Sequence, residues 1–282
     1  MLMEEIKIPK RILTSLINSI SAGVVPRAGA PFIAIGREEE IKTFARDLET
    51  VADGGAGMRF IIGKYGSGKS FLIQLMRGYA LEHGFITADA DLSPERRLCG
   101  AKGTGRATFK EIMKNLASKS SPDGGALNGI ITKWLSQLQY DVTAEGIQPG
   151  DSRFERAVTA KLMSSLRVLQ QQVGGFDFAQ VLLKYYKAQR DGNDEECALC
   201  LKWLRGEYTT KTEAKASLCV GSIIDDENWY EYIKLYAVFF RLIGYKGFVV
   251  FIDECVNLYK ISNRISRENN YEKILSMFND TL

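Results

Sequence analysis

The residues best suited to chemistry lie in one glycine-rich octapeptide, GKYGSGKS, which runs from Gly63 to Ser70. It matches the pattern G-x-x-x-x-G-K-[ST] at every fixed position. Glycines in such a loop let backbone N–H groups turn inward around a phosphate, which side chains would obstruct. Lys69 would then reach the β- and γ-phosphates of a nucleoside triphosphate, and the Ser70 hydroxyl would bind magnesium. We therefore expect ATP, or a close relative, together with Mg²⁺ as cofactors.

The elements around this loop must present it to the phosphates. Met58–Ile62 is a short apolar run bounded by glycines and fits a buried parallel strand. Ser70–Glu82 reads as a helix whose positive N-terminal end faces the bound phosphates. Phe85–Ala90 follows as the next strand, so a parallel sheet in a three-layer α/β fold is expected. The expected phosphate-binding residues are Gly63, Lys64, Tyr65, Gly66, Ser67, Gly68, Lys69, Ser70 and Phe71.

A second motif supplies carboxylates. Gly247–Glu254 (GFVVFIDE) is an apolar run that ends in Asp253 and Glu254. A buried strand of this kind places its acids at the carboxyl edge of the sheet, where ligands of α/β proteins bind. Asp253 would hold the magnesium shell, and Glu254 would act as the general base on the attacking water. The simpler alternative is a strand that happens to end in two acids before a turn.

A third candidate lies upstream, in the segment IAIGREEE from Ile33 to Glu40. Gly36 would allow a close backbone approach to a ligand. Arg37 and the acids after it would open a helix, because carboxylates are favoured in a first turn. An ordinary helix start explains the same residues, so both interpretations stay open on the residues alone.

Helical patterns dominate the rest of the chain. Further helices are expected at residues 9–22, 38–51 and 268–278. The middle of the chain adds Phe109–Leu116, Leu127–Leu138, Arg153–Val173, Phe178–Gln189, Cys197–Leu204 and Trp229–Ile243. The organisation expected is an α/β core in two parts, residues 1–120 with the glycine-rich loop and residues 227–282 with the acidic strand. A helical insertion, residues 121–226, separates them.

Two weaker signals have simpler structural explanations. Arg96, Arg97, Lys102, Arg106 and Lys110 cluster after the second strand, as either a nucleic-acid-binding patch or a solvated loop, and the solvated loop is the simpler interpretation. The segment 197–200 is a C-x-x-C with no second pair, so ordinary helix packing is favoured over a metal site.

Bulk properties narrow the class of protein. No stretch approaches the roughly 18 apolar residues of a membrane span. The five cysteines are few and odd in number, which favours reduced thiols in the cytoplasm over a disulfide framework. The N-terminal residues MLMEEIKIPKRIL do not read as a secretory signal. The net charge of +3 neither demands nor excludes a nucleic-acid partner.

GREEE, GKYGSGKS and VVFIDE, in that order, resemble the motifs of AAA+-like P-loop ATPases of the origin-recognition and signal-transducing branches. The resemblance implies an ASCE-type core in which Ile35, Gly36 and Arg37 line the adenine. More narrowly, DADLSPERRL, AKGTGRATFKEIM, KWLRGE, GYKGFVVFIDE and NRISRENNYEKIL resemble the ATP-binding proteins (BrxD type) of the BREX phage-defence system.

The chain departs from that family pattern in two places. The two phosphate-site motifs are separated by roughly 180 residues, far more than in typical AAA+ proteins, and the helical insertion accounts for the excess. The family also continues with a sensor strand, a helical lid and a DNA-binding region, so the sequence looks like the N-terminal portion of a longer protein.

The leading expectation is an ATP hydrolase, with Lys69 and Glu254 as catalytic residues, whose nucleotide state controls assembly on DNA, with partner proteins or with further copies of itself. One alternative is a slow nucleotide-gated switch that uses the helical insertion as its binding surface. Another is a phosphotransferase acting on a small molecule, which the Asp253–Glu254 pair disfavours because a kinase needs no water-activating acid there.

Overall fold

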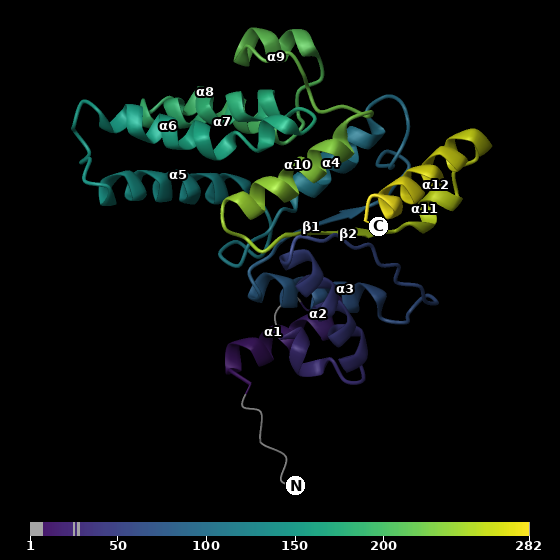
Figure 1. The fold of residues 1–282 in the computed structure, drawn as a ribbon. Coiled ribbons are helices and arrows are strands. Elements are labelled where there is room, and N and C mark those ends of the chain that lie inside the picture. Colours follow the sequence, from purple (N-terminus) through teal and green to yellow (C-terminus); the bar gives the residue numbers. More distant parts are fainter. Residues whose placement is uncertain (1–7, 25, 27–28, 282) are drawn as a thin grey trace.

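A two-stranded parallel sheet lies at the centre of the computed structural model, which describes residues 8–24, 26 and 29–281. Strand β1 (Ile86–Asp91) pairs with β2 (Phe248–Asp253) in a register that sets Ile86 beside Phe248 and Asp91 beside Asp253. Helices cover both faces of the sheet (Figure 1). Both strands form where the sequence predicts strands, the sheet is parallel as expected, and the protein is a helix-rich α/β structure.

One face of the sheet carries the helices that flank the glycine-rich loop. Helix α2 (Glu38–Ala52) and helix α3 (Lys69–Glu82) both form where the periodicity predicts them. Their apolar sides meet the sheet in a small core that contains Phe44, Leu48, Leu72, Leu75, Met76 and Phe85. Helix α1 (Lys10–Ser21) and the short 3-10 helix η1 (Ala30–Ile33) precede them, and Gly29 packs closely on α1 side chains.

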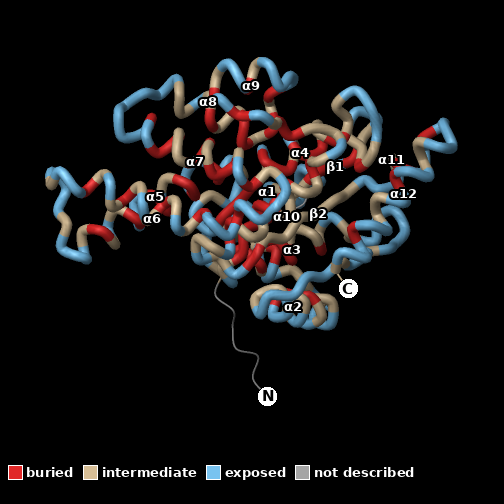
Figure 2. Tube along the Cα trace, turned by 45° about the horizontal axis from the view of Figure 1, so that its top comes forward, coloured by how far each residue is buried: buried red, intermediate tan, exposed pale blue. Residues whose placement is uncertain are grey.

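The opposite face is covered by helix α4 (Thr104–Lys114) and helix α10 (Trp229–Leu242), which join a larger core. Aromatic rings dominate this contact. The ring of Phe240 packs edge-on against Phe248 of β2, with 5.2 Å between ring centroids. Buried residues gather along β1 and the inner sides of these helices, β2 is of intermediate burial, and the outer turns are exposed (Figure 2). The α4 helix begins five residues earlier than the periodicity predicts.

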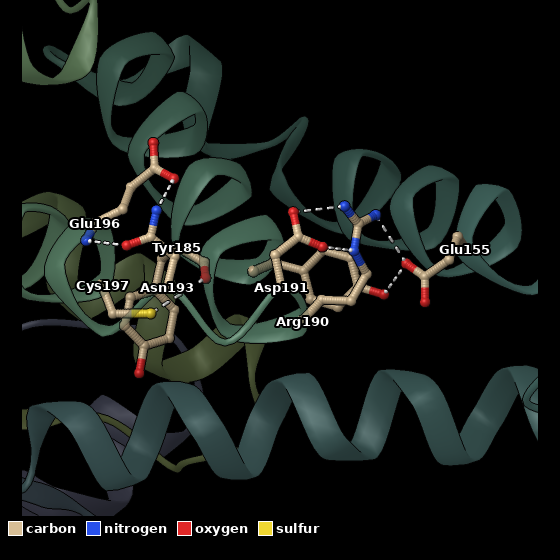
Figure 3. A network of polar contacts seen from close by, with 8 residues as sticks. Glu155, Tyr185, Arg190, Asp191, Asn193, Glu196 and Cys197 are labelled. Atoms are coloured by element: carbon tan, nitrogen blue, oxygen red, sulfur yellow. Dashed lines mark hydrogen bonds and ion pairs between the residues drawn. The ribbon is translucent and has the colours of Figure 1, made fainter.

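A helical array extends from this face (Figure 1). Its members are α5 (Leu127–Ala144), α6 (Phe154–Leu166), the 3-10 helix η2 (Leu169–Gln171), α7 (Gly175–Arg190), α8 (Asp194–Leu204) and α9 (Lys211–Leu218). Polar contacts fix the α7–α8 corner, as Figure 3 shows. The Asn193 side chain caps α8 by accepting from the Glu196 N–H at 3.1 Å, and Arg190 bridges Glu155 and Asp191.

The predicted strand at Met58–Ile62 is wrong. These residues follow an irregular path outside the sheet, and Ile62 is 94% exposed. The segment instead packs by side chains, since Phe60 lies against Phe278 and Arg59 pairs with Asp47. Apolar composition favours a strand, but a strand also needs a backbone partner, and within the described residues β2 pairs only with β1.

Two further helical predictions need correction, and two helices form that the sequence did not predict. The helix expected over residues 153–173 ends at Leu166 and gives way to η2. Helix α9 and the short α11 (Val256–Tyr259) were not expected. The last helix, α12 (Arg264–Asn279), starts earlier than predicted because Asn263 caps it, accepting from the Ser266 N–H at 2.8 Å.

The sequence predicts no membrane span and favours helix packing over a metal site at residues 197–200. No helix in the described part of the chain is long and apolar enough to cross a membrane. Within the same residues, no three His, Cys, Asp or Glu side chains form a group suited to a metal ion. Cys200 is buried in helix packing and Cys197 lies against the Tyr185 carbonyl (Figure 3). Most of the segment considered as a secretory signal, residues 1–7, lies outside the described residues.

Candidate nucleotide-binding site

The glycine-rich loop has the backbone shape that its glycines predict. Gly66 and Gly68 adopt left-handed φ angles of 77° and 81°, which side-chain-bearing residues rarely adopt. A Cβ on Gly63 would lie only 2.4 Å from the Ser67 hydroxyl oxygen. Gly63 therefore packs closely on the Ser67 side chain, and Lys64 and Tyr65 are exposed on the loop. Helix α3 starts directly after Gly68, and Phe71 lies in its first turn.

The Lys69 ammonium lies over the loop itself. Its Nζ donates to the carbonyl oxygens of Gly63 and Lys64, each at 3.0 Å. These are ordinary neutral acceptors, so a phosphate oxygen would compete for the same cation on favourable terms. The lysine therefore lies over the loop with only neutral acceptors as its hydrogen-bond partners.

Two distant motifs meet at the start of α3. The Ser70 hydroxyl donates to Asp253 Oδ2 at 3.3 Å. Asp253 ends β2, and alternate residues of that strand face the two cores, which turns its side chain toward α3. One hydroxyl and one carboxylate at a helix N-terminus are oxygen ligands that magnesium accepts alongside phosphate oxygens. The sequence prediction that these two residues share one site is consistent with this geometry.

Glu254 stands in an unusual backbone conformation. Its φ is +56°, in the left-handed region, although it is not a glycine. Its N–H donates to Asp253 Oδ1 at 2.8 Å, which ties the two acids together. Left-handed backbone in a residue with a side chain costs about 1–2 kcal/mol and is concentrated at functional sites. The side chain is exposed just beyond the sheet edge, where a water molecule can reach it.

The upstream segment reaches the loop through one side chain. Arg37 Nη2 donates to the Ser67 carbonyl at 2.7 Å, and Nη1 pairs with Glu40 at 2.7 Å. The hydrogen bond from Arg37 lowers the pKa of the exposed Glu40 carboxyl. Gly36 has a φ of +75° and Ile35 is 92% exposed, so the turn presents an apolar side chain beside the loop. No pattern in the sequence predicts the Arg37–Ser67 bond.

Sequence reasoning missed a third carboxylate at the same edge. Asp91 ends β1 beside Asp253, and paired residues of parallel strands point to the same side of the sheet. Partial burial and the nearby Asp253 raise the pKa of Asp91, while Arg96 opposes the rise. In the sequence, Asp91 stands at the end of the predicted strand, in Asp89–Ala90–Asp91. Only the register of the two strands shows that it lies beside Asp253.

Helix α3 is anchored to the sheet at a second point. Arg77 is 6% exposed, and its Nε forms an ion pair with Asp89 of β1 at 3.1 Å. Its Nη2 also donates to the Pro122 carbonyl at 2.7 Å, at the turn that leads into α5. The loop-bearing helix is therefore tied to β2 through Ser70, and to β1 and the helical array through Arg77.

The segments that follow the two strands are also fastened together. Asn270 of α12 is fully buried, and its Oδ1 accepts from the N–H groups of Leu98 and Cys99 at 3.0 and 2.9 Å. Its Nδ2 donates to the Cys99 and Ser266 carbonyls. Asn257 donates to the Leu92 carbonyl at 2.7 Å. These bonds fix the outer border of the edge at which Asp91 and Asp253 lie.

The comparisons with known proteins decide the family. A family model described as BREX system ATP-binding protein BrxC/D matches residues 8–282. The chain belongs to this BREX ATP-binding family. Membership indicates ATP binding in phage defence, which agrees with the resemblance drawn from the motifs. No curated protein and no solved structure matches the chain.

The residues of this BREX protein fit the cofactors that the motif implies. The left-handed backbone of Gly66 and Gly68 gives the loop the tight turns that a backbone phosphate site uses. The Ser70–Asp253 pair offers hard oxygen donors of the kind that magnesium selects. Lys69 adds the cation that a triphosphate needs for charge balance.

Proposed function

We propose that this chain is a magnesium-dependent ATPase of the AAA+/origin-recognition type, built on a three-layer P-loop core. The observation that carries the proposal is the hydrogen bond from Ser70 Oγ to Asp253 Oδ2 at 3.3 Å. It joins the phosphate-binding motif to the acidic strand across 183 residues, at the N-terminal end of α3. A hydroxyl and a carboxylate at this place form the protein's half of a magnesium–triphosphate site.

In this proposal the backbone of residues 63–71 wraps the phosphates. Lys69 leaves the two loop carbonyls and pairs with the β- and γ-phosphate oxygens. The N-terminal end of α3 adds the favourable field of its dipole. Ile35, Gly36 and Arg37 border the base, since Arg37 already bridges that turn to Ser67.

Hydrolysis is assigned to Glu254. Its carboxylate accepts a proton from a water molecule whose oxygen attacks the γ-phosphorus, and the bond to the bridging oxygen breaks to give ADP and phosphate. Asp253 and Ser70 would hold the magnesium ion, which when bound would supply charge neutralisation at the phosphates. The exposure of Glu254 directly after the strand supports this role, because water can reach its carboxylate.

The proposal extends to what the nucleotide controls. The core comprises residues 1–120 and 227–282, and the helical insertion spans residues 121–226. The Arg77 contact with Pro122 links the loop-bearing helix to the start of that insertion. A cytoplasmic defence ATPase of this design would use its nucleotide state to regulate assembly on DNA, with partner proteins or with copies of itself.

Nucleotide binding is tested with Lys69→Ala, by titrating the protein with a fluorescent ATP analogue in the presence of Mg²⁺. We expect the affinity to fall by roughly 100-fold, since a charge-assisted contact to phosphate is worth about 1.5–3 kcal/mol. Lys133→Ala is the matched control, because it removes the same charge from an exposed position on α5, outside the nucleotide site. Equal affinities for Lys69→Ala and wild type would refute the phosphate assignment.

Hydrolysis is tested with Glu254→Gln, by measuring phosphate release. We expect ATP binding to persist while turnover falls by about 10²–10⁴-fold, the usual contribution of a general base. Turnover at the wild-type rate would remove Glu254 from the mechanism. Tight binding by the wild type with no measurable turnover would favour a slow switch, and phosphate transfer to a small molecule in place of release would favour a phosphotransferase.

A further inference from the structure

The glycine-rich loop has few backbone bonds of its own. Residues 56–66 lie in neither a helix nor a strand. Within the described part of the chain, their one backbone hydrogen bond is that of the Lys64 carbonyl, which accepts from the Ser67 N–H at 3.2 Å. Lys69 adds two side-chain bonds, to the Gly63 and Lys64 carbonyls. A loop that no strand anchors depends on such side-chain contacts to keep a defined shape.

One side chain ties this loop to helix α2. Arg37 lies directly before the helix, and its Nη1 pairs with Glu40 of the first turn at 2.7 Å. Its Nη2 donates to the Ser67 carbonyl at 2.7 Å. The guanidinium also lies against the loop backbone, since a Cβ on Gly68 would be 3.1 Å from Nη2. Because the apolar side of α2 packs in the smaller core, Arg37 connects the loop to a firmly held helix.

The bond to Ser67 fixes the direction of one peptide group in the loop. The Ser67 carbonyl and the Gly68 N–H share a trans peptide group, so they point in opposite directions. With the carbonyl held toward Arg37, the Gly68 N–H is directed to the other side of the peptide. This N–H and that of Gly66 donate to no other described residue. Backbone N–H groups of this kind are what a glycine-rich loop offers to phosphate oxygens.

The Arg37 contact differs from the Lys69 contacts in what a ligand does to it. In the proposed function, Lys69 leaves the Gly63 and Lys64 carbonyls for the phosphate oxygens. The loop then loses two of its hydrogen bonds when it receives the ligand. The bond from Arg37 to the Ser67 carbonyl does not take part in that exchange. Its donor is ionised, which makes it stronger than a neutral hydrogen bond.

We infer that Arg37 is a positioning residue for the glycine-rich loop, which keeps the loop N–H groups directed toward the phosphates of the nucleotide. Glu40 holds the guanidinium, and the guanidinium holds the Ser67–Gly68 peptide group. The inference rests on the proposed function and specifies how Arg37 serves it. The residue acts on the phosphate end of the ligand through the loop, and not through a hydrogen bond to the base. Its contribution is therefore the same for any ligand that presents the same phosphates.

The test compares two ligands in the presence of Mg²⁺: the fluorescent ATP analogue, and inorganic tripolyphosphate, which has no base and is measured by displacing the analogue. We expect Arg37→Ala to weaken the binding of both by roughly tenfold, the lower end of what a hydrogen bond to a charged group contributes. Arg37→Lys keeps the charge but lacks the planar fork that holds Glu40 and Ser67 together, so most of the loss should remain. Arg46→Ala is the matched control, because it removes an exposed arginine from the same helix and should leave both affinities unchanged.

Turnover and stability separate positioning from a general loss of structure. In Arg37→Ala the KM for ATP should rise by a similar factor while kcat stays within about twofold, because the loop holds the substrate and the transition state alike. The urea midpoints of Arg37→Ala and Arg46→Ala should agree closely, since neither side chain is buried. A fall in kcat with an unchanged KM would contradict the inference.

Three binding results would also overturn it. Equal affinities of Arg37→Ala and Arg46→Ala would show that the tether does not matter. A loss for the ATP analogue with none for tripolyphosphate would assign Arg37 to the base, and full affinity in Arg37→Lys would reduce its role to charge. Lys69→Ala in the same titrations separates this inference from the proposed function. If Lys69→Ala weakens binding and Arg37→Ala does not, only the positioning role of Arg37 fails.

Discussion

Ser70 and Asp253 lie 183 residues apart in the chain, yet the hydroxyl of one donates to the carboxylate of the other at 3.3 Å. The contact exists because β2 pairs with β1 in a register that ends both strands beside the start of α3. Everything between the two residues in sequence, including the whole helical array, is accommodated without separating them. The two halves of the candidate site are therefore brought together by the sheet rather than by a local loop.

Replacing Asp253 by Asn should remove the magnesium dependence of nucleotide binding. In titrations with the fluorescent ATP analogue, adding Mg²⁺ should raise the nucleotide affinity of the wild type. The increase should be smaller in the variant, by a factor on the order of ten or more. Glu254→Gln serves as the control and should keep the full gain. An unchanged magnesium effect in Asp253→Asn would place the ion elsewhere.

Replacing Glu254 by Gly should stabilise the fold, even though it removes the proposed base. The left-handed φ of +56° costs a residue with a Cβ about 1–2 kcal/mol, and the greater freedom of glycine in the unfolded chain offsets part of the gain. We expect Glu254→Gly to exceed Glu254→Ala by about 0.5–1 kcal/mol in the free energy of unfolding, measured by urea denaturation. A lower stability for the glycine variant would contradict the strain at this position.

Arg77→Met should destabilise the protein by about 2–4 kcal/mol. The substitution leaves Asp89 without its ion-pair partner and removes the bond to the Pro122 carbonyl, in a place where Arg77 is almost fully buried. Lys119→Met is the matched control, because its ion pair with Glu82 is exposed and should be worth less than about 1 kcal/mol. Similar urea midpoints for the two variants would argue against an anchoring role for Arg77.

Asn270→Ala should lower the free energy of unfolding by about 2–4 kcal/mol, because it leaves the buried N–H groups of Leu98 and Cys99 without their acceptor. The neighbouring Asn269 is exposed on the same helix, and its replacement by alanine should change the free energy of unfolding by less than about 0.5 kcal/mol. The comparison is again by urea denaturation. If both variants unfold at the same urea concentration, the network around Asn270 contributes nothing measurable.

The raised pKa of Asp91 predicts that Asp91→Asn increases the stability of the fold, by an amount that depends on pH. A carboxyl whose pKa is higher in the folded than in the unfolded state destabilises the fold once the pH exceeds the unfolded value, about 3.8. The amide removes that penalty, so the variant should have the higher melting temperature at neutral pH. The difference should shrink as the pH falls toward and below 3.8. A gain that is the same at acidic and neutral pH would point to packing rather than charge.

Local chemistry made the glycine-rich loop and most helices predictable. The positions of Gly66 and Gly68, and the amphipathic patterns of α2 and α3, depend on neighbours in sequence. Pairing partners do not, which explains the wrong strand at Met58–Ile62. That run has the apolar composition of a strand, and whether it finds a backbone partner is decided by distant residues.

The same limit applies within the candidate site. Asp253 and Glu254 could be read from the end of an apolar run, but Asp91 joins them only through the register of β1 and β2. The Arg37–Ser67 and Arg77–Asp89 contacts each link segments whose sequences give no sign of one another. Long charged side chains reach their partners across folded surfaces, so their contacts follow from the tertiary arrangement rather than from periodicity.

The two anchors of α3 have a mechanical consequence. Ser70 and Arg77 are seven residues apart, so they lie on nearly the same side of the helix, about 10 Å apart along its axis. Ser70 is hydrogen-bonded to Asp253 of β2, and Arg77 is bound to Asp89 of β1 and to the Pro122 carbonyl. If a bound ligand breaks the hydrogen bond of Ser70, the end of the helix at Arg77 stays attached and becomes the point about which the helix tilts. A displacement at the phosphates would then reach the helical array as a rotation at Pro122, with the direction set by the end that stays attached.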